Sequence, residues 1–123
     1  MATLTEIKLN KAERKLSLSF DNGKSYVLSA EYLRVHSPSA EVRGHGVGQE
    51  VLQLGKELVA ITDVEPVGNY AVRLIYSDNH DTGIYSWEYL EELAENLDEN
   101  WQDYLERVKQ AGQKRKTFVN AAL

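Results

Sequence analysis

The spacing of hydrophobic residues changes once along the chain, at Ser86, and this change limits the folds open to it. Before Ser86, apolar residues alternate with polar ones, as at Leu16, Leu18 and Phe20, which is the period of half-buried strands. After Ser86, apolar residues recur every three or four positions, which is the period of an amphipathic helix. The sequence therefore predicts strands first and helices last, in an α+β fold.

The strand-forming part divides into two groups. Residues 4–28 are predicted to form a small antiparallel meander, because Asp21-Asn22-Gly23 offers a hairpin turn between two alternating segments. A second group of strands is predicted at residues 58–63, 70–76 and 82–85. A turn at 65–69 would separate the first two of these.

Between the two groups lies the longest stretch without a periodic pattern. Ser29 is a candidate N-cap for a short helix over 30–34. Residues 36–50 contain three glycines and Pro38, so we expect them to form a loop.

The last part of the chain predicts two helices, over about 86–95 and 98–111, because Asn96 and Asp98 favour a boundary over a helix interior. Gly112 is placed to end the second helix. We expect both helices to pack on the small sheet and residues 1–112 to form a single domain. Residues 113–123 are expected to be a mobile basic tail.

Composition excludes several classes of protein. The chain has no cysteine, which removes disulfides, thiolate metal sites and a cysteine nucleophile. It has no phosphate-binding P-loop and no nucleophile elbow, so we expect no enzymatic activity. It has neither an apolar run long enough to cross a membrane nor a secretion signal, so we expect a cytoplasmic protein without membrane contact.

Charge is concentrated near the C-terminus. Residues 88–106 hold eight acidic residues and no basic one, and this acidic helix face disfavours nucleic-acid binding. The tail that follows is basic. Its residues Lys114, Arg115 and Lys116 are candidates for docking on an acidic protein partner, and the alternative is a solvated end of the chain.

Three histidines fall in predicted loops, at His36, His45 and His80. Neutral imidazole is the commonest metal ligand near neutral pH, so these side chains are candidate metal ligands. Carboxylates that could complete such a site are Glu41, Asp78 and Asp81. The alternative is three exposed or hydrogen-bonded histidines.

Three segments together resemble one family. Residues 33–46 read LRVHSPSAEVRGHG, residues 70–85 read YAVRLIYSDNHDTGIY, and residues 86–90 read SWEYL. In this order they are similar to the gamma-butyrobetaine hydroxylase-like N-terminal domain, also called domain of unknown function 971. The resemblance covers roughly residues 5–111.

The resemblance implies a small zinc module whose ligands are missing here. In the related oxygenases, a Cys-Pro-Cys-x-x-Cys loop and a later histidine hold zinc. These positions correspond to Ser37, Ser39, Val42 and His80, so one ligand of four remains. Any cofactor would therefore be a divalent metal such as zinc or iron held without thiolates.

If the two loops meet, two readings stay open. In the first, His36, His45 and His80 converge on a metal ion. In the second, hydrogen bonds replace the metal: Ser37 or Ser39 would bond to His80, and Glu41 to Arg43.

The family also implies a role. Its members precede the catalytic core of carnitine-pathway oxygenases or follow the ATPase domain of iron–sulfur carrier proteins. We therefore expect a non-catalytic accessory domain that binds a protein partner and is linked to iron–sulfur or metalloprotein maturation. The alternative is a metal-ion-binding protein that uses the loop histidines.

Overall fold

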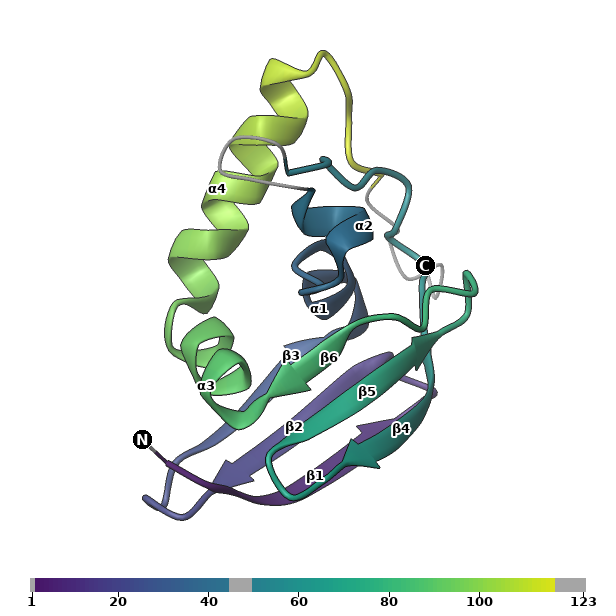
Figure 1. Ribbon diagram of the computed structural model, residues 1–123. Helices are drawn as coiled ribbons and strands as arrows, with labels where there is room; N and C mark the ends of the chain where they lie inside the picture. The colour runs from purple at the N-terminus through teal and green to yellow at the C-terminus, as the bar shows by residue number, and fades with distance from the viewer. Residues whose placement is uncertain (1, 45–49, 117–123) are drawn as a thin grey trace, which may run out of the picture.

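The computed structural model describes residues 2–44 and 50–116 of the chain. They form two three-stranded antiparallel sheets and four helices, which confirms the predicted α+β class. In Figure 1 the strands of both sheets follow a common diagonal, and the helices gather on one side of them.

The first sheet contains β1 (Leu4–Asn10), β2 (Lys15–Phe20) and β3 (Ser25–Ser29), in that order. Leu16, Leu18 and Phe20 are buried, and the serines between them lie toward the other side. The predicted turn is present, and Gly23 has φ of 83°, a conformation that L side chains rarely adopt.

The second sheet contains β4 (Ile61–Val67), β5 (Ala71–Tyr76) and β6 (Ile84–Ser86). The prediction for β4 was wrong at both ends, because the strand begins later than 58 and continues through the predicted turn to Val67. Pro66 lies within β4, opposite Val72. An edge strand accepts proline because one of its sides has no ladder to donate to, and β4 is such an edge.

The helices are α1 (Ala30–Val35), α2 (Ala40–Arg43), α3 (Trp87–Glu95) and α4 (Leu97–Gln110). Ser29 and Ser86 cap α1 and α3 as predicted. The short helix α2 corrects the expectation of a continuous loop over 36–50. It forms because the Ser39 hydroxyl accepts from the backbone N–H of Glu41 and so caps the turn.

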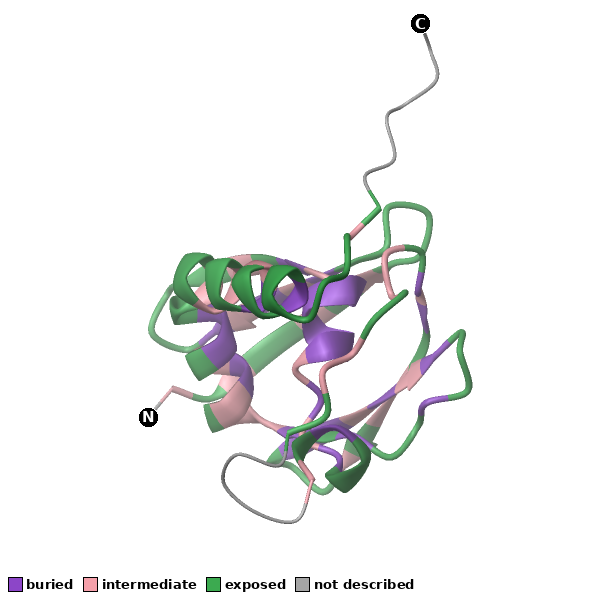
Figure 2. Ribbon diagram, turned by 90° about the horizontal axis from the view of Figure 1, so that it is seen from above, coloured by how far each residue is buried: buried purple, intermediate pink, exposed green. Residues whose placement is uncertain are grey.

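Both sheets share one core with α1 and α3. The largest fully buried side chains come from all of these elements and include Leu18, Leu33, Leu74 and Leu90. A smaller cluster of Val35, Tyr104 and Val108 joins α4 to α1. Figure 2 shows the outer side of α4 exposed along its length. Its exposed acidic side chains are Asp98, Glu99, Asp103 and Glu106.

Tyrosine hydroxyls close the C-terminal end of α1. The Tyr85 hydroxyl donates to the carbonyl of Leu33 at 2.7 Å, and the Tyr89 hydroxyl donates to that of His36 at 2.5 Å. The last carbonyls of a helix have no partner within it, so these phenols supply the missing donors. Residues of β6 and α3 thereby fix the position at which α1 ends and the next segment begins.

None of the helices formed by residues 2–44 and 50–116 is both long and apolar enough to span a membrane.

Candidate functional site

A cluster of two buried polar side chains and one exposed carboxylate joins the segment after α1 to the turn between β5 and β6. The hydroxyl of Ser37 lies 2.8 Å from Nε2 of His80, and Nδ1 of His80 lies 3.1 Å from Oε2 of Glu41. Ser37 is 1% exposed and His80 is 4% exposed. We call Ser37, His80 and Glu41 the histidine cluster.

A second contact draws the same two segments together. The hydroxyls of Ser39 and Thr82 are 2.7 Å apart. Nearby, a Cβ atom added to Gly83 would lie 2.5 Å from the hydroxyl oxygen of Ser37, so the backbone there approaches as closely as a glycine permits. The two loops therefore meet, as the zinc-module resemblance required.

The hydrogen-bond partners of His80 define its protonation. A carboxylate can only accept, so Nδ1 carries the proton and donates to Glu41, while Nε2 accepts from the hydroxyl of Ser37. Burial lowers the pKa of His80, and the charge of Arg34 lowers it further, against the opposing effect of Glu41. His80 is therefore neutral at pH 7.

The order serine, histidine, carboxylate is also that of a hydrolase triad, but the surroundings differ. A nucleophile must reach its substrate, whereas the Ser37 hydroxyl is enclosed by His80 and Gly83. The backbone N–H of Ser37, a natural oxyanion donor, is already bonded to the carbonyl of Arg34 at 3.2 Å. The geometry is that of a hydrogen-bond network that fixes two loops.

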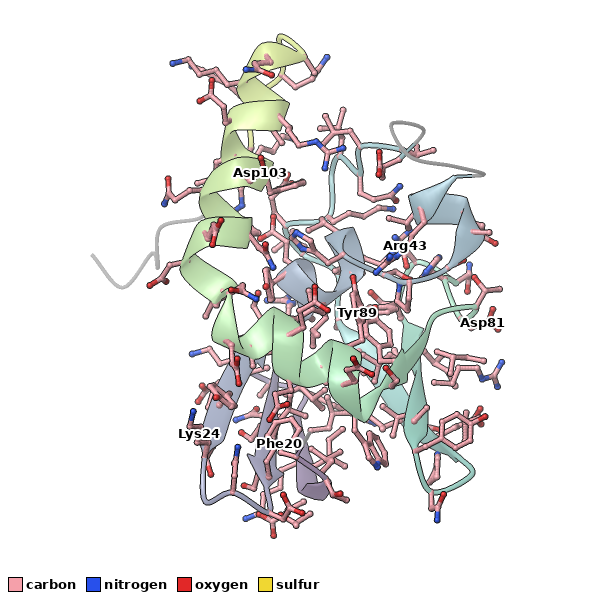
Figure 3. All side chains as sticks on the ribbon, turned by 60° about the vertical axis from the view of Figure 1, so that its left-hand side comes forward. Phe20, Lys24, Arg43, Asp81, Tyr89 and Asp103 are labelled. Carbon is pink, nitrogen blue, oxygen red and sulfur yellow. The ribbon has the colours of Figure 1, made fainter. Side chains whose placement is uncertain are left out.

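One expected contact of that network differs. Glu41 was expected to bond to Arg43, and its carboxylate instead faces His80. Arg43 of α2 lies with its guanidinium carbon 4.7 Å from the ring centre of Tyr89 of α3 (Figure 3). A guanidinium stacks readily on an aromatic face, so Arg43 has a partner without the carboxylate.

The histidines occupy different surroundings. The ring of His36 lies against Tyr32, with a centroid distance of 4.7 Å, and its Nδ1 donates to the carbonyl of Tyr32 at 2.9 Å. His80 lies against Tyr76 instead. His45 lies outside the described residues. Within the two described ranges, no three or more histidine, aspartate and glutamate side chains are grouped so that they could hold a metal ion.

Charged side chains support the loop that carries His80. Asp78 accepts from Nε of Arg34 at 3.0 Å and from the amine of Lys56 at 2.7 Å. These two cations lower the pKa of Asp78 against the opposing effect of burial. The ion pairs fix the turn after β5 to α1, on which Ser37 depends for its position.

A cleft of about 470 Å³ opens beside the histidine cluster. Its walls are the end of α1, helix α2, residues 50–53 and the facing sides of α3 and α4. The apolar lining residues are Val35, Val42, Val51 and Leu52. The exposed side chains of Arg43 and Arg107 belong to the same lining, as do His36 and the exposed carboxylate of Glu50, so the two arginines leave the lining with an excess of positive charge.

The lowered pKa of His36 is consistent with a half-buried position in the cleft beside two arginines. Burial lowers the pKa of His36, and the charges of Arg107 and Arg43 also lower it, while Asp103 has the opposite effect. The imidazole is therefore neutral, and its environment contains two guanidinium groups. Sequence reasoning missed Arg107, Tyr89 and Tyr104 as cleft residues, because only the tertiary fold brings α3 and α4 against α2.

The candidate docking residues near the C-terminus divide into two kinds. Lys114 and Lys116 are exposed. Arg115 is half-buried and forms an ion pair with Glu31 of α1, so it is bound within the molecule rather than presented to a partner. The expectation of a free tail thus fails at Arg115, because a buried carboxylate on α1 attracts it.

Comparison with known proteins agrees with this fold. The model of the family "Gamma-butyrobetaine hydroxylase-like, N-terminal" matches residues 7–91. Two NMR solution structures are each 46% identical to the chain in sequence, and the matches cover all of this chain. They cover 92% of the first solved chain and 97% of the second, with TM-scores of 0.82 and 0.81. No curated protein matches the chain.

A crystal structure extends the comparison to a named organism. It is of a protein of unknown function from Acidithiobacillus ferrooxidans that belongs to the DUF971 family. It is 37% identical, covers 75% of this chain and 92% of its own, and superposes with a TM-score of 0.63. The chain therefore belongs to the gamma-butyrobetaine hydroxylase-like N-terminal domain family, as the resemblance predicted.

Proposed function

We propose that this protein is a non-catalytic accessory domain that binds an acidic segment of a partner protein in the cleft between α2 and α4. The observation that carries the proposal is the pairing of an apolar floor with two exposed guanidinium groups, those of Arg43 and Arg107. Apolar residues supply affinity, and cations of this kind select carboxylates.

The cleft is held open by hydrogen bonds between its own lining residues. The Tyr104 hydroxyl donates to the carbonyl of Gln53 at 2.7 Å, which ties α4 to the 50–53 segment. The backbone N–H of Val51 donates to the carbonyl of Val42 at 2.7 Å. Val51 itself is 53% exposed, so an apolar side chain stands at the rim where a partner would arrive.

The acidic outer face of α4 adds selectivity. Its carboxylates would repel nucleic acid and the acidic residues of a partner that approached from that side. A segment that carries acidic residues would be directed to the cleft, where both arginines lie. Charge thus favours one orientation of the partner.

Family membership supports the accessory role. The domain accompanies oxygenase cores and iron–sulfur carriers in the resemblance described above, so we propose a link to iron–sulfur or metalloprotein maturation in the cytoplasm. The histidine cluster fits such a role because it holds the loops beside the cleft without needing a metal ion. This link rests on the proteins that the domain accompanies.

Site-specific photo-crosslinking tests the proposal. A benzophenone side chain placed at position 51 lies on the cleft rim, and one at Val27, which is 55% exposed on β3, is a matched control. We expect a discrete crosslinked product at position 51 that disappears when Arg43 and Arg107 are both changed to glutamine. Equal products at both positions, or a product that persists without the arginines, would contradict the proposal.

The alternative function, metal-ion binding through the histidines, has its own test. Elemental analysis of untagged protein purified without chelator is compared with a His80→Ala variant. Near-stoichiometric zinc or iron that is lost in the variant would favour metal handling. The absence of metal from both samples, with no thermal shift on adding ions, would count against it.

A further inference from the structure

Glu31 is a buried carboxylate whose partner comes from far along the chain. It lies on α1 and is 6% exposed. Nε of Arg115 donates to its Oε2 at 2.8 Å, and Nη2 of Arg115 donates to its Oε1. The pair is thus bidentate, with two parallel N–H bonds meeting both oxygens of one carboxylate.

An aromatic face and a second carboxylate complete the surroundings of the guanidinium. The guanidinium carbon of Arg115 lies 5.3 Å from the ring centre of Trp101 on α4. The charge of Glu57 adds to that of Glu31 in raising the pKa of Arg115. A planar cation that stacks and donates twice fits these groups, whereas the single amine of lysine cannot meet both oxygens in this way.

Over residues 111–116, Arg115 is the side chain that bonds the segment after α4 to the rest of the molecule. Its neighbours in sequence are exposed, namely Gly112, Gln113, Lys114 and Lys116. The backbone N–H groups of Gly112 and Gln113 bond only to the preceding turn of α4, at Lys109 and Val108. Among the described residues, the hydrogen bonds that this segment makes beyond α4 all come from Arg115. The site therefore recognises a guanidinium group and not a particular backbone.

We propose that Glu31 and Trp101 form an exchangeable guanidinium-binding site, which Arg115 fills in the free protein and an arginine of a partner protein can fill in its place. A buried carboxylate left alone is strongly destabilising, so Arg115 leaves only when another cation of the same shape arrives. A tethered side chain competes at an effective concentration in the millimolar range, which a partner held at a second point can exceed. The site is separate from the cleft and does not depend on the function proposed for it.

The test begins with an Arg115→Ala variant, which empties the site in an otherwise complete chain. We expect its melting temperature to fall by about 10 °C, because Glu31 loses its partner. Adding N-acetyl-argininamide at tens of millimolar should restore about 4 °C of this loss. N-acetyl-citrullinamide has the same shape without the charge and should restore nothing.

A double variant, Glu31→Gln with Arg115→Ala, supplies the specificity control, because it should not respond to argininamide. Equal effects of argininamide and citrullinamide, or an equal response of the double variant, would overturn the proposal.

If the single variant does not fold, the Nε–H signal of Arg115 is followed by NMR in the natural protein. Displacement by argininamide alone is expected, and a signal unchanged at saturating probe would overturn exchange. Glutamine at Arg43 and Arg107 should leave all of these responses unaltered, which separates this site from the cleft.

Discussion

Nε2 of His80 and the hydroxyl of Ser37 lie 2.8 Å apart, although 43 residues separate them in the sequence. The contact joins the segment between α1 and α2 to the turn after β5, and Glu41 completes it from the other side of the imidazole. Because both ring nitrogens are engaged while the ring is neutral, adding a proton to His80 turns Nε2 into a donor, and the hydroxyl of Ser37 loses its acceptor and must turn to accept instead. Stability should therefore respond to pH through this residue.

Between pH 7.5 and pH 5, we expect the free energy of unfolding to decrease as the pH falls. The folded-state pKa of His80 is lowered from its ordinary value of 6.5. Just below this pH, His80 therefore binds a proton in the unfolded chain but not in the folded one. Stability is complete above 6.5 and is lost progressively below it, with a limiting slope of about 1.4 kcal/mol per pH unit for this one group.

Urea unfolding of the natural protein and a His80→Gln variant at several pH values measures this effect. His36 has a lowered pKa as well, so a His36→Gln variant is the matched comparison. Each variant should show a shallower dependence than the natural protein. A His80→Gln curve parallel to the natural one would contradict the role given to His80.

Restoring the missing cysteines should create a zinc site. The triple variant Ser37→Cys, Ser39→Cys and Val42→Cys places three thiols in the positions that the family resemblance assigns to ligands, beside His80. Three thiolates and one imidazole form a usual tetrahedral set for zinc. We expect about one zinc ion per chain by elemental analysis, and fewer when His80→Ala is added. A triple variant that retains no more zinc than the natural protein would show that the two loops do not meet in the way described.

Gly83→Ala should destabilise the protein by about 1–3 kcal/mol, because the new methyl group would lie 2.5 Å from the hydroxyl oxygen of Ser37. The obstructing atom is the hydroxyl, so Ser37→Ala removes much of the conflict. Chemical denaturation of both single variants and the double variant forms a cycle that isolates the interaction. Strictly additive effects would mean that the two residues are not in contact.

Tyr85→Phe should cost about 1–3 kcal/mol, because it leaves two buried partners without their hydrogen bonds. The Tyr85 hydroxyl donates to the carbonyl of Leu33 and accepts from the hydroxyl of Tyr76 at 2.8 Å. Tyr70→Phe is the matched control, since Tyr70 is 59% exposed. The free energies of unfolding in urea compare the two, and equal losses would contradict the buried role of Tyr85.

The sequence predicted those parts of the fold whose cause is local. The alternation of apolar and polar residues predicted which side chains of β2 and β5 are buried. Ser29 and Ser86 predicted where α1 and α3 begin. The extent of β4 could not be predicted, because Pro66 disfavours a strand in general and is accepted only at an edge. Which strand lies at an edge is a property of the assembled sheet.

The candidate site was predictable only where a resemblance supplied the missing geometry. The approach of Ser37 to His80 followed from the aligned zinc loop, since neither residue has a local signal. Arg107 and Glu31 carry no such signal and are typical surface residues by type. Glu31 is buried because α1 lies beneath α4 and the segment after it, an arrangement that only the tertiary fold establishes.

The phenol caps on α1 have a consequence for the order of assembly during synthesis. The donors from Tyr85 and Tyr89 stand 52 and 53 residues downstream of the carbonyls they satisfy. A growing chain therefore has neither donor for the end of α1 until β6 and the start of α3 have been made. Because such distant contacts form late, a nascent chain that stops before Tyr85 lacks the hydrogen bonds that complete the end of α1.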